Sequence, residues 1–272
     1  MMNVIIFSKD RACQLELFLR SMKEMWKECM DDQKVNISVL FTASKDRYWD
    51  GYYKLINKGS PVPLVLMQKQ ESFKIDVLSL VNPAFKHTVF FVDDMVWKEP
   101  FSLECEEFKE FESRDDVLCL SLRLHPKLPY CYVTDKEQKI PKIEDGVFDW
   151  TGANGDYGYP MSLDGHIFRT EDILPLLKIE KYANPNELEA WLSGYEFKFF
   201  KKRPCMVCCE KSPVMNVPLN QVHEGWVNRH GRFPAKYLND NFLKGFVISM
   251  DEIRGFKNKS CHQEVDIKLE KA

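Results

Sequence analysis

The chain has 272 residues, of which 44% are hydrophobic and 29% charged, and its formal net charge is −3. This composition is ordinary for a globular protein and excludes collagen-like, coiled-coil and strongly disordered chains. A near-neutral chain without a basic block argues against nonspecific nucleic-acid binding, which needs many phosphate contacts. The length suits one large α/β domain or two small domains.

The first half of the chain alternates apolar strands with helices. We expect strands over residues 3–7, 35–41, 64–67 and 87–92, and helices over residues 13–26, 51–56 and 72–81. The first strand is apolar on both faces, as a central parallel strand is. The alternation predicts an α/β fold with a Rossmann-like, mostly parallel central sheet that carries helices on both faces.

The second half of the chain is less periodic. We expect helices over residues 104–112, 172–177 and 186–193, and strands over residues 117–124 and 197–207. Residues 125–165 are rich in Pro, Gly, Tyr and Trp and show little periodicity. No repeat or linker separates the halves, so the second half reads as an elaboration of the same sheet.

No segment resembles a signal peptide or reaches the roughly 20 apolar residues of a membrane span. The nine cysteines are an odd number without framework spacing, so we expect reduced thiols. We therefore expect a cytoplasmic protein, which needs a partner or a surface patch for any contact with a membrane. Cys205 and Cys208 are half of a possible zinc site that Cys261 and His262 would complete, but thiols on a buried strand explain them as well.

Two adjacent carboxylates, Asp93 and Asp94, directly follow the apolar strand 87–92. They repel each other and lose solvation unless a cation compensates them. Their oxygens suit Mg²⁺ or Mn²⁺ bridged to phosphates. The alternative is a solvated turn at the end of the strand. The polar segments 8–11 and 42–50 follow two other strands, so all three would meet at one crevice.

The segment Val4–Leu15, together with Asp93-Asp94, resembles glycosyltransferases of the GT-A fold, particularly family 2. Those enzymes begin with an apolar strand, a loop rich in Ser or Thr, Asp and Arg, and a helix that starts at a Gln-Leu or similar pair. They carry an Asp-x-Asp motif after roughly the first ninety residues; here it is Asp-Asp followed by Met95. The resemblance implies inversion at the anomeric carbon, a nucleotide-diphosphate sugar (UDP-, GDP- or dTDP-linked), a glycan or other hydroxyl acceptor, and Mn²⁺ or Mg²⁺.

The resemblance also implies roles for individual residues. Asp94 would be the main metal ligand, Asp93 would contact the ribose or a phosphate and share the metal, and His223 would close the metal shell. The nucleotide pocket would be lined by Ser8, Asp10, Arg11, Thr42, Ser44 and Lys74. Ordinary surface roles are the alternative for Arg11, Lys74 and His223, and Arg229 would then be a second candidate for the diphosphate.

A segment rich in Gly and aromatic residues, 149–168, has side chains of the kind that bind sugars. Rings pack on the apolar face of a pyranose, and polar groups hold its hydroxyls. The candidate acceptor-binding residues are Trp150, Asp156, Tyr157, Tyr159 and His166. The alternative is a well-packed Gly-rich loop, although long loops in compact domains are often functional.

An inverting transfer needs a general base near the acceptor hydroxyl. In the GT-A fold this base is usually a carboxylate at the start of a helix after the acceptor loop, a place taken here by residues 184–191. We expect Glu189 as the base, with Glu187 second and Asp164 third. The alternatives are helix-dipole stabilisation for Glu187 and plain exposure for Glu189.

The resemblance predicts one catalytic domain over residues 1–256, with a nucleotide-sugar-binding half (1–98) and an acceptor-binding half (99–256), followed by a loose polar tail (257–272). Two other functions stay open. A sugar-nucleotide nucleotidyltransferase normally has a Gly-rich phosphate loop after its first strand, and Ser8–Ala12 lacks glycine. A non-catalytic carbohydrate-binding protein on the same fold is the other. The sequence does not indicate an oligomeric state.

Overall fold

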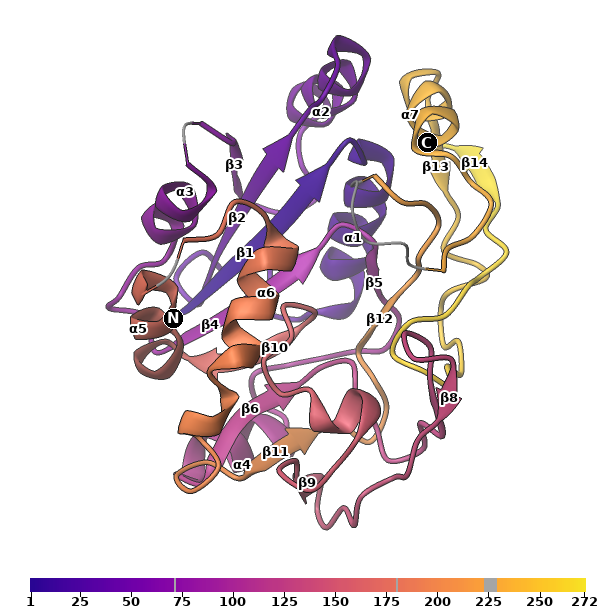
Figure 1. Ribbon diagram of the computed structural model, residues 1–272. Helices are drawn as coiled ribbons and strands as arrows, with labels where there is room; N and C mark the ends of the chain where they lie inside the picture. The colour runs from indigo at the N-terminus through magenta and orange to yellow at the C-terminus, as the bar shows by residue number, and fades with distance from the viewer. Residues whose placement is uncertain (71, 180, 223–228) are drawn as a thin grey trace.

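The computed structural model describes residues 1–70, 72–179, 181–222 and 229–272. A central sheet of eight strands crosses the molecule, with helices on both of its faces (Figure 1). Along the sheet the strands follow in the order β3 (Val65–Gln68), β2 (Val35–Thr42), β1 (Met2–Lys9), β4 (His87–Val92), β10 (His166–Arg169), β6 (Val117–Ser121), β11 (Cys205–Cys208) and β9 (Val147–Asp149).

The sheet is mixed, with parallel pairing predominating in its first half. Strands β1, β2, β3 and β4 pair in parallel, and β6 pairs in parallel with β11. Strand β10 is antiparallel to both β4 and β6, and β9 is antiparallel to β11. Because β10 lies between them, β4 and β6 run in the same direction. The predicted α/β class with a mostly parallel sheet is confirmed.

Alternating residues of β1 belong to two hydrophobic cores, one on each face of the sheet. Val4 and Ile6 belong to one core, and Ile5 and Phe7 belong to the other. The first core is covered by α1 (Ala12–Met25), α2 (Asp46–Lys58), α4 (Glu106–Ser113) and α7 (Ala235–Leu243). The second core is covered by α3 (Phe73–Leu80), α5 (Thr170–Ile179) and α6 (Pro185–Gly194). Burial on both faces explains why β1 has no polar alternation.

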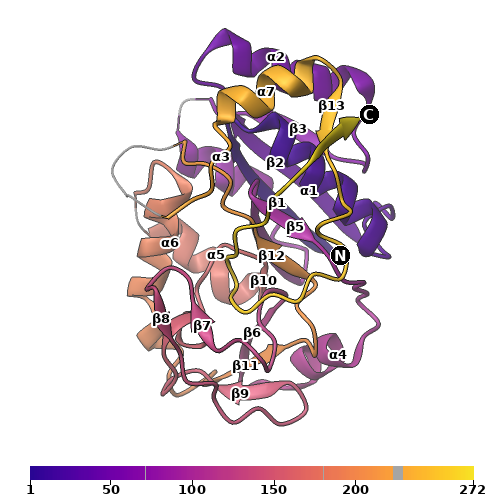
Figure 2. The same cartoon turned by 90° about the vertical axis from the view of Figure 1, so that its right-hand side faces the viewer.

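Short strand pairs and two 3₁₀ turns complete the fold. Helix α7 packs beside α1 and α2 at one end of the molecule (Figure 2). The pairs are β5 (Met95–Trp97) with β12 (Val214–Asn216), β7 (Tyr130–Cys131) with β8 (Lys136–Glu137), and β13 (Phe246–Ile248) with β14 (Leu269–Lys271); the 3₁₀ turns are η1 (Gly155–Gly158) and η2 (Glu196–Lys198). No helix in the described part of the chain is long and apolar enough to cross a membrane.

The expectation of a loose tail over residues 257–272 is wrong. Cys261 is fully buried, Ile267 joins the first core, and β14 pairs with β13. A few apolar residues within this polar segment attach it to the core. They do not recur with a helical or strand period, so the sequence does not predict their burial. The strand expected over residues 197–207 is also shorter, because its first part forms η2 and β11 begins only at Cys205.

Candidate functional site

A cavity of about 920 Å³ lies at the carboxyl ends of the parallel strands. Its size suits a small-molecule site, and its position is the one that open α/β sheets use for ligands. The first half of the chain supplies Ser8, Lys9, Arg11, Thr42, Lys69, Asp93 and Asp94 to its wall. The second half supplies Arg123, Asp156, Tyr159, Asp164, Glu187, Glu189, Asn216, Asn220 and His262, among others.

Asp93 is buried at the end of β4, and both of its carboxylate oxygens are hydrogen-bonded. Ser8 Oγ and the Lys9 backbone N–H donate to Oδ2 at 2.8 and 3.0 Å, and Arg11 Nη1 donates to Oδ1 at 2.9 Å. Burial raises the pKa of Asp93 to about 6, against the effect of Arg11 and with a contribution from Asp94. These contacts fix the carboxylate as a rigid part of the wall.

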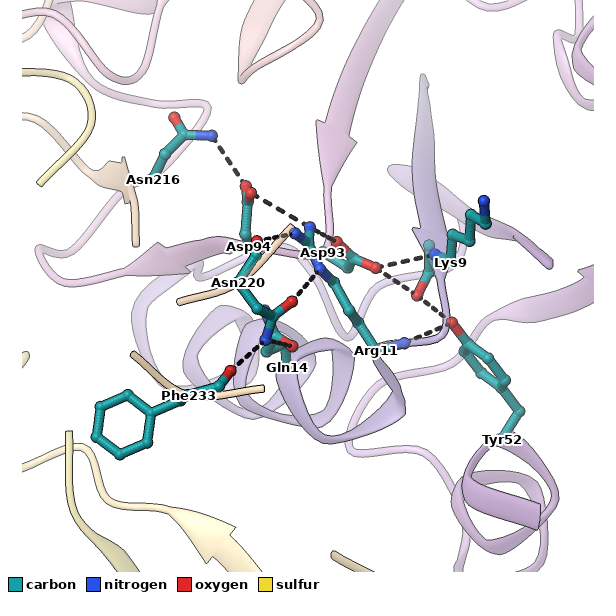
Figure 3. Close-up of polar contacts among 10 residues, drawn as sticks. Lys9, Arg11, Gln14, Tyr52, Asp93, Asp94, Asn216, Asn220 and Phe233 are labelled. Atoms are coloured by element: carbon teal, nitrogen blue, oxygen red, sulfur yellow. Dashed lines mark hydrogen bonds and ion pairs between the residues drawn. The ribbon is translucent and has the colours of Figure 1, made fainter. Parts of the chain in front are cut away.

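Arg11 lies between the two acidic side chains and binds both (Figure 3). Its Nη1 is 2.9 Å from Asp93 Oδ1 and 3.3 Å from Asp94 Oδ2. Its Nε donates to Asn220 Oδ1 at 2.9 Å, and its Nη2 donates to the Asn220 carbonyl. Asn220 is in turn held by the Phe233 carbonyl. A guanidinium therefore compensates the acidic pair within the protein itself.

Asp94 is the more accessible member of the pair. Its side chain is 19% exposed, compared with 4% for Asp93. Asn216 Nδ2 donates to Asp94 Oδ1 at 3.2 Å, and the Asn216 Oδ1 has no partner among the described residues although it is buried. Asp94 therefore has coordination capacity that Asp93 lacks.

The donor set fits a divalent cation that is shared with a bound phosphate. Within the described ranges, no group of three or more His, Cys, Asp or Glu side chains could hold a metal ion. Mg²⁺ commonly needs only one or two carboxylates when substrate phosphates supply further ligands. Asp94 meets that requirement because it is the more exposed of the two carboxylates, whereas Asp93 is buried and accepts three hydrogen bonds. The predicted ligand His223 lies outside the described residues.

Asp10 and Ser44 bind each other and do not line the cavity. Asp10 has a positive φ of 58° and accepts the Ser44 N–H and Oγ, both at 2.7 Å. Tyr52, which the sequence did not suggest, places its hydroxyl 2.6 Å from Ser8 Oγ and accepts the Arg11 backbone N–H at 3.2 Å. These contacts hold the loops after β1 and β2 around the site.

Lys74 does not reach the cavity, and Lys69 takes its place. Lys74 Nζ donates to the Lys178 carbonyl at 2.7 Å, on the outside of the fold. Lys69 follows the last residue of β3 and lines the cavity. Its position directly after a parallel strand could have predicted that Lys69 lines the cavity.

Three of the five predicted acceptor-binding residues belong to the core. Trp150 donates its indole N–H to the Arg203 carbonyl at 2.8 Å, and Tyr157 donates its hydroxyl to the His125 carbonyl at 2.6 Å. His166 is fully buried, with Nδ1 2.9 Å from the Pro160 carbonyl. The structure thus favours the packing alternative for these three, because large rings fill the second core.

Asp156 and Tyr159 do line the cavity. Asp156 is held by Gln138, whose Oε1 accepts the Asp156 N–H at 2.8 Å and whose Nε2 donates to Oδ2 at 3.3 Å. Gly155, Ser162, Leu163 and Asp164 of the same segment line it as well, so a ligand can reach this part of segment 149–168.

A second acidic group, Glu189 and Asp164, also lines the cavity. Glu189 lies on α6 and is partly buried, and its Oε1 accepts Ser162 Oγ at 2.9 Å and the Leu163 N–H at 3.0 Å. Burial, followed by the charge of Asp164, raises the pKa of Glu189. This carboxylate is therefore a stronger base than an exposed glutamate.

Asp164 has the opposite electrostatic environment. Arg123 Nη1 lies 3.1 Å from its Oδ2, and His262 Nε2 lies 3.5 Å from the same oxygen. Burial acts to raise the pKa of Asp164, but His262 and Arg123 outweigh burial and lower it. Gly165, with a φ of 73°, turns the chain from this aspartate into β10.

Glu187 caps the start of α6. Its carboxylate accepts the Ala183 N–H and the Asn184 side-chain amide, both at 2.8 Å, and Asn184 Oδ1 accepts the Glu187 N–H at 3.0 Å. This reciprocal arrangement is a capping box built on asparagine. The helix-start role foreseen as the alternative for Glu187 is therefore present, although the residue also borders the cavity.

Arg123, Asn216, Asn220 and His262 also line the cavity and, like Lys69, were not foreseen in the sequence. Arg123 is only 2% exposed, and its Nε has no hydrogen-bond partner among the described residues. Arg123 comes two residues after β6, at the same sheet edge as Asp93. Its position relative to the strand could therefore have predicted a place in the cavity wall. The other three lie at a short strand end or on irregular segments that have no sequence period.

Comparison with known proteins adds a sequence relative. No known family model matches the chain. The bifunctional glycosyltransferase pgtA of Dictyostelium discoideum is 25% identical over an alignment of 298 positions, which covers 96% of this chain and 36% of that protein. The resemblance to glycosyltransferases is confirmed. The chain spans only about a third of this relative's length.

Solved structures give weaker likenesses. TarS of S. aureus matches with a TM-score of 0.49 and 14% identity over 78% of this chain and 36% of that chain. The mannosyltransferase PcManGT of Pyrobaculum calidifontis, in complex with GDP-Man and Mn²⁺, matches with a TM-score of 0.42 and 12% identity over 76% of this chain and 54% of that chain. Likeness at this level does not establish a shared fold or activity.

Proposed function

We propose that the protein is a metal-dependent, inverting glycosyltransferase that moves a sugar from a nucleotide-diphosphate sugar to a hydroxyl acceptor, such as a glycan. One observation carries the proposal: two acidic groups from different parts of the chain, Asp93-Asp94 and Glu189-Asp164, line a single cavity. The similarity to a bifunctional glycosyltransferase along nearly the whole chain supports it. The nine free thiols support a cytoplasmic location.

In this proposal the half formed by residues 1–98 binds the donor. Ser8, Thr42 and Asp93 border the space for the nucleoside, and Lys9 and Lys69 supply positive charge for a UDP-, GDP- or dTDP-linked diphosphate. Asp94 would hold Mn²⁺ or Mg²⁺ together with the diphosphate oxygens, with His223 as a candidate for a further ligand. The cation would stabilise the charge of the departing diphosphate.

The acceptor would enter the half formed by residues 99–256, beside Asp156 and Tyr159. Glu189 is the proposed base, because its hydrogen bonds with the described residues both use Oε1 and leave Oε2 for the acceptor hydroxyl. Oε2 takes the hydroxyl proton while the acceptor oxygen bonds to the anomeric carbon. The bond from that carbon to the diphosphate oxygen breaks, and the configuration inverts.

The remaining carboxylates suit supporting roles. Asp164 is held ionised by Arg123 and His262, so it is a weaker base than Glu189. Its negative charge helps to keep the pKa of Glu189 high. Glu187 stabilises the start of the helix that carries Glu189. The structure therefore supports the order of candidates in which Glu189 comes first.

The proposal is tested by release of nucleotide from a panel of UDP-, GDP- and dTDP-sugars, with Mn²⁺, with Mg²⁺ and with chelator. We expect slow, metal-dependent release from at least one donor. Asp94→Asn should abolish the metal dependence, whereas Asp46→Asn, at an exposed position on α2, should behave as the wild type. Absence of both release and nucleotide-dependent thermal stabilisation for every donor would contradict the enzyme and favour a carbohydrate-binding protein.

A further inference from the structure

A surface outside the cavity carries three large exposed rings. Trp191, Phe197 and Phe200 are 42%, 59% and 44% exposed, and they all lie within residues 191–202. Single exposed hydrophobic residues are common, but a cluster of exposed rings marks an interaction surface. We call residues 191–202 the aromatic–basic turn. It spans the end of α6, η2 and the start of the connection to β11, at the edge of the molecule (Figure 1).

Two of the three exposed rings, Phe197 and Phe200, contact other rings of the fold. Phe197 stacks on Tyr195 with a centroid distance of 6.4 Å, and Lys198 Nζ lies 4.4 Å from the Tyr195 ring centroid. The Phe200 ring is 5.3 Å from that of the buried Trp150. The turn therefore presents a preformed apolar surface, so that docking needs little ordering of its side chains.

Positive charge surrounds the rings. Lys198, Lys201 and Lys202 are exposed, and within the described ranges neither Lys198 nor Lys201 forms an ion pair. Lys202 Nζ lies 3.8 Å from Asp172 Oδ1. Glu196 is the single acidic residue among residues 191–202. The turn is thus locally cationic in a chain whose net charge is −3.

We propose that the aromatic–basic turn docks on an anionic lipid surface. Aromatic rings favour the headgroup region of a bilayer, and lysines are attracted to anionic headgroups. Charge alone would suit any polyanion, but the three exposed rings favour a partner with an apolar layer beneath its negative surface. Lipid docking is therefore a better match than an acidic protein or a nucleic acid.

Helix α6 connects this surface to the cavity. Glu189 lines the cavity, and Trp191 at the end of the same helix is exposed. A helix of ten residues is about 15 Å long, so the two sites are close. An acceptor presented at a membrane surface would therefore lie within a short reach of the cavity.

The test is sedimentation of the full chain with vesicles of phosphatidylcholine alone or with about one third phosphatidylserine, in about 0.1 M salt, where screening acts over about 10 Å. One variant combines Phe197→Ser with Trp191→Ser, and another combines Lys198→Glu with Lys201→Glu. The matched controls are Tyr53→Ser with Tyr237→Ser, at exposed rings on α2 and α7 at the other end of the molecule (Figure 1), and Lys45→Glu with Lys58→Glu.

We expect binding to the anionic vesicles only, and at least tenfold weaker binding for the aromatic variant. Each unit of positive charge removed should weaken binding roughly fivefold, and each Lys→Glu change shifts the charge by two units. Both controls should bind as the wild type. Equal binding by either variant and its control, or no binding to anionic vesicles, would overturn the proposal. Binding to heparin that survives loss of the rings, without vesicle binding, would identify a soluble polyanion as the partner. No donor or acceptor is used, so the outcome is independent of the proposed sugar transfer.

Discussion

Replacement of Glu189 by Gln gives the sharpest test of the proposed chemistry. Glutamine keeps an Oε1 that accepts the bonds from Ser162 Oγ and the Leu163 N–H, so the fold and the position of the side chain should persist. Only the ability of Oε2 to take a proton is lost. A positioned general base typically contributes about 10²–10⁴-fold in rate, which is about 2.7–5.4 kcal/mol of activation barrier.

The assay is nucleotide release under saturating donor, measured for the wild type, Glu189→Gln and Glu187→Gln. We expect the loss for Glu189→Gln in kcat, with KM for the donor nearly unchanged, because Glu189 belongs to the proposed acceptor half of the cavity and Asp94 to the donor half. Glu187→Gln can keep the helix cap and should retain kcat. Release by Glu189→Gln within threefold of the wild type, or a larger loss for Glu187→Gln, would refute the assignment.

Three further predictions concern charge. Asp164→Asn removes a charge that raises the pKa of Glu189, so the acid limb of the pH–rate profile should move to lower pH; an unmoved limb would contradict the coupling. The pKa of Asp93 is raised from 3.8 to about 6, so its contribution to stability is greatest below about pH 4 and is lost as pH rises to about 6. Chemical denaturation across this range should show a decline of about 3 kcal/mol that Asp93→Asn abolishes. Arg123→Gln leaves Asp164 without its buried cation and should cost about 3–5 kcal/mol of unfolding free energy, whereas exposed Arg232→Gln should cost little in the same denaturation experiment.

The parts of the site that follow strands were predictable from sequence. Buried parallel strands are continuous apolar runs, and the polar residue after each run must lie at one edge of the sheet. This reasoning found Ser8, Thr42 and the acidic pair. Applied consistently, it would also have found Lys69 and Arg123, which follow β3 and β6.

The rest of the site depends on packing that the sequence does not encode locally. Trp150 and His166 stand in a segment that looks suited to sugars, yet their rings fill the core because the second face of the sheet needs large apolar side chains. His262 reaches the cavity because Cys261 beside it is buried. An isolated apolar residue in a polar segment gives no periodic signal, so neither contact was foreseeable.

The guanidinium of Arg11 gives the acidic pair a resident counter-ion. A site compensated in this way can fold before any metal arrives, so chelation should leave the melting temperature of the free protein unchanged. Arg11 also competes with a divalent cation for the Asp94 carboxylate. A cation bound to Asp94 must share that carboxylate with the Arg11 guanidinium, which lies 3.3 Å away, or displace it, while the 2.9 Å contact between Arg11 and Asp93 persists. Metal binding alone would then be weak, and the cation would enter chiefly as a complex with the diphosphate.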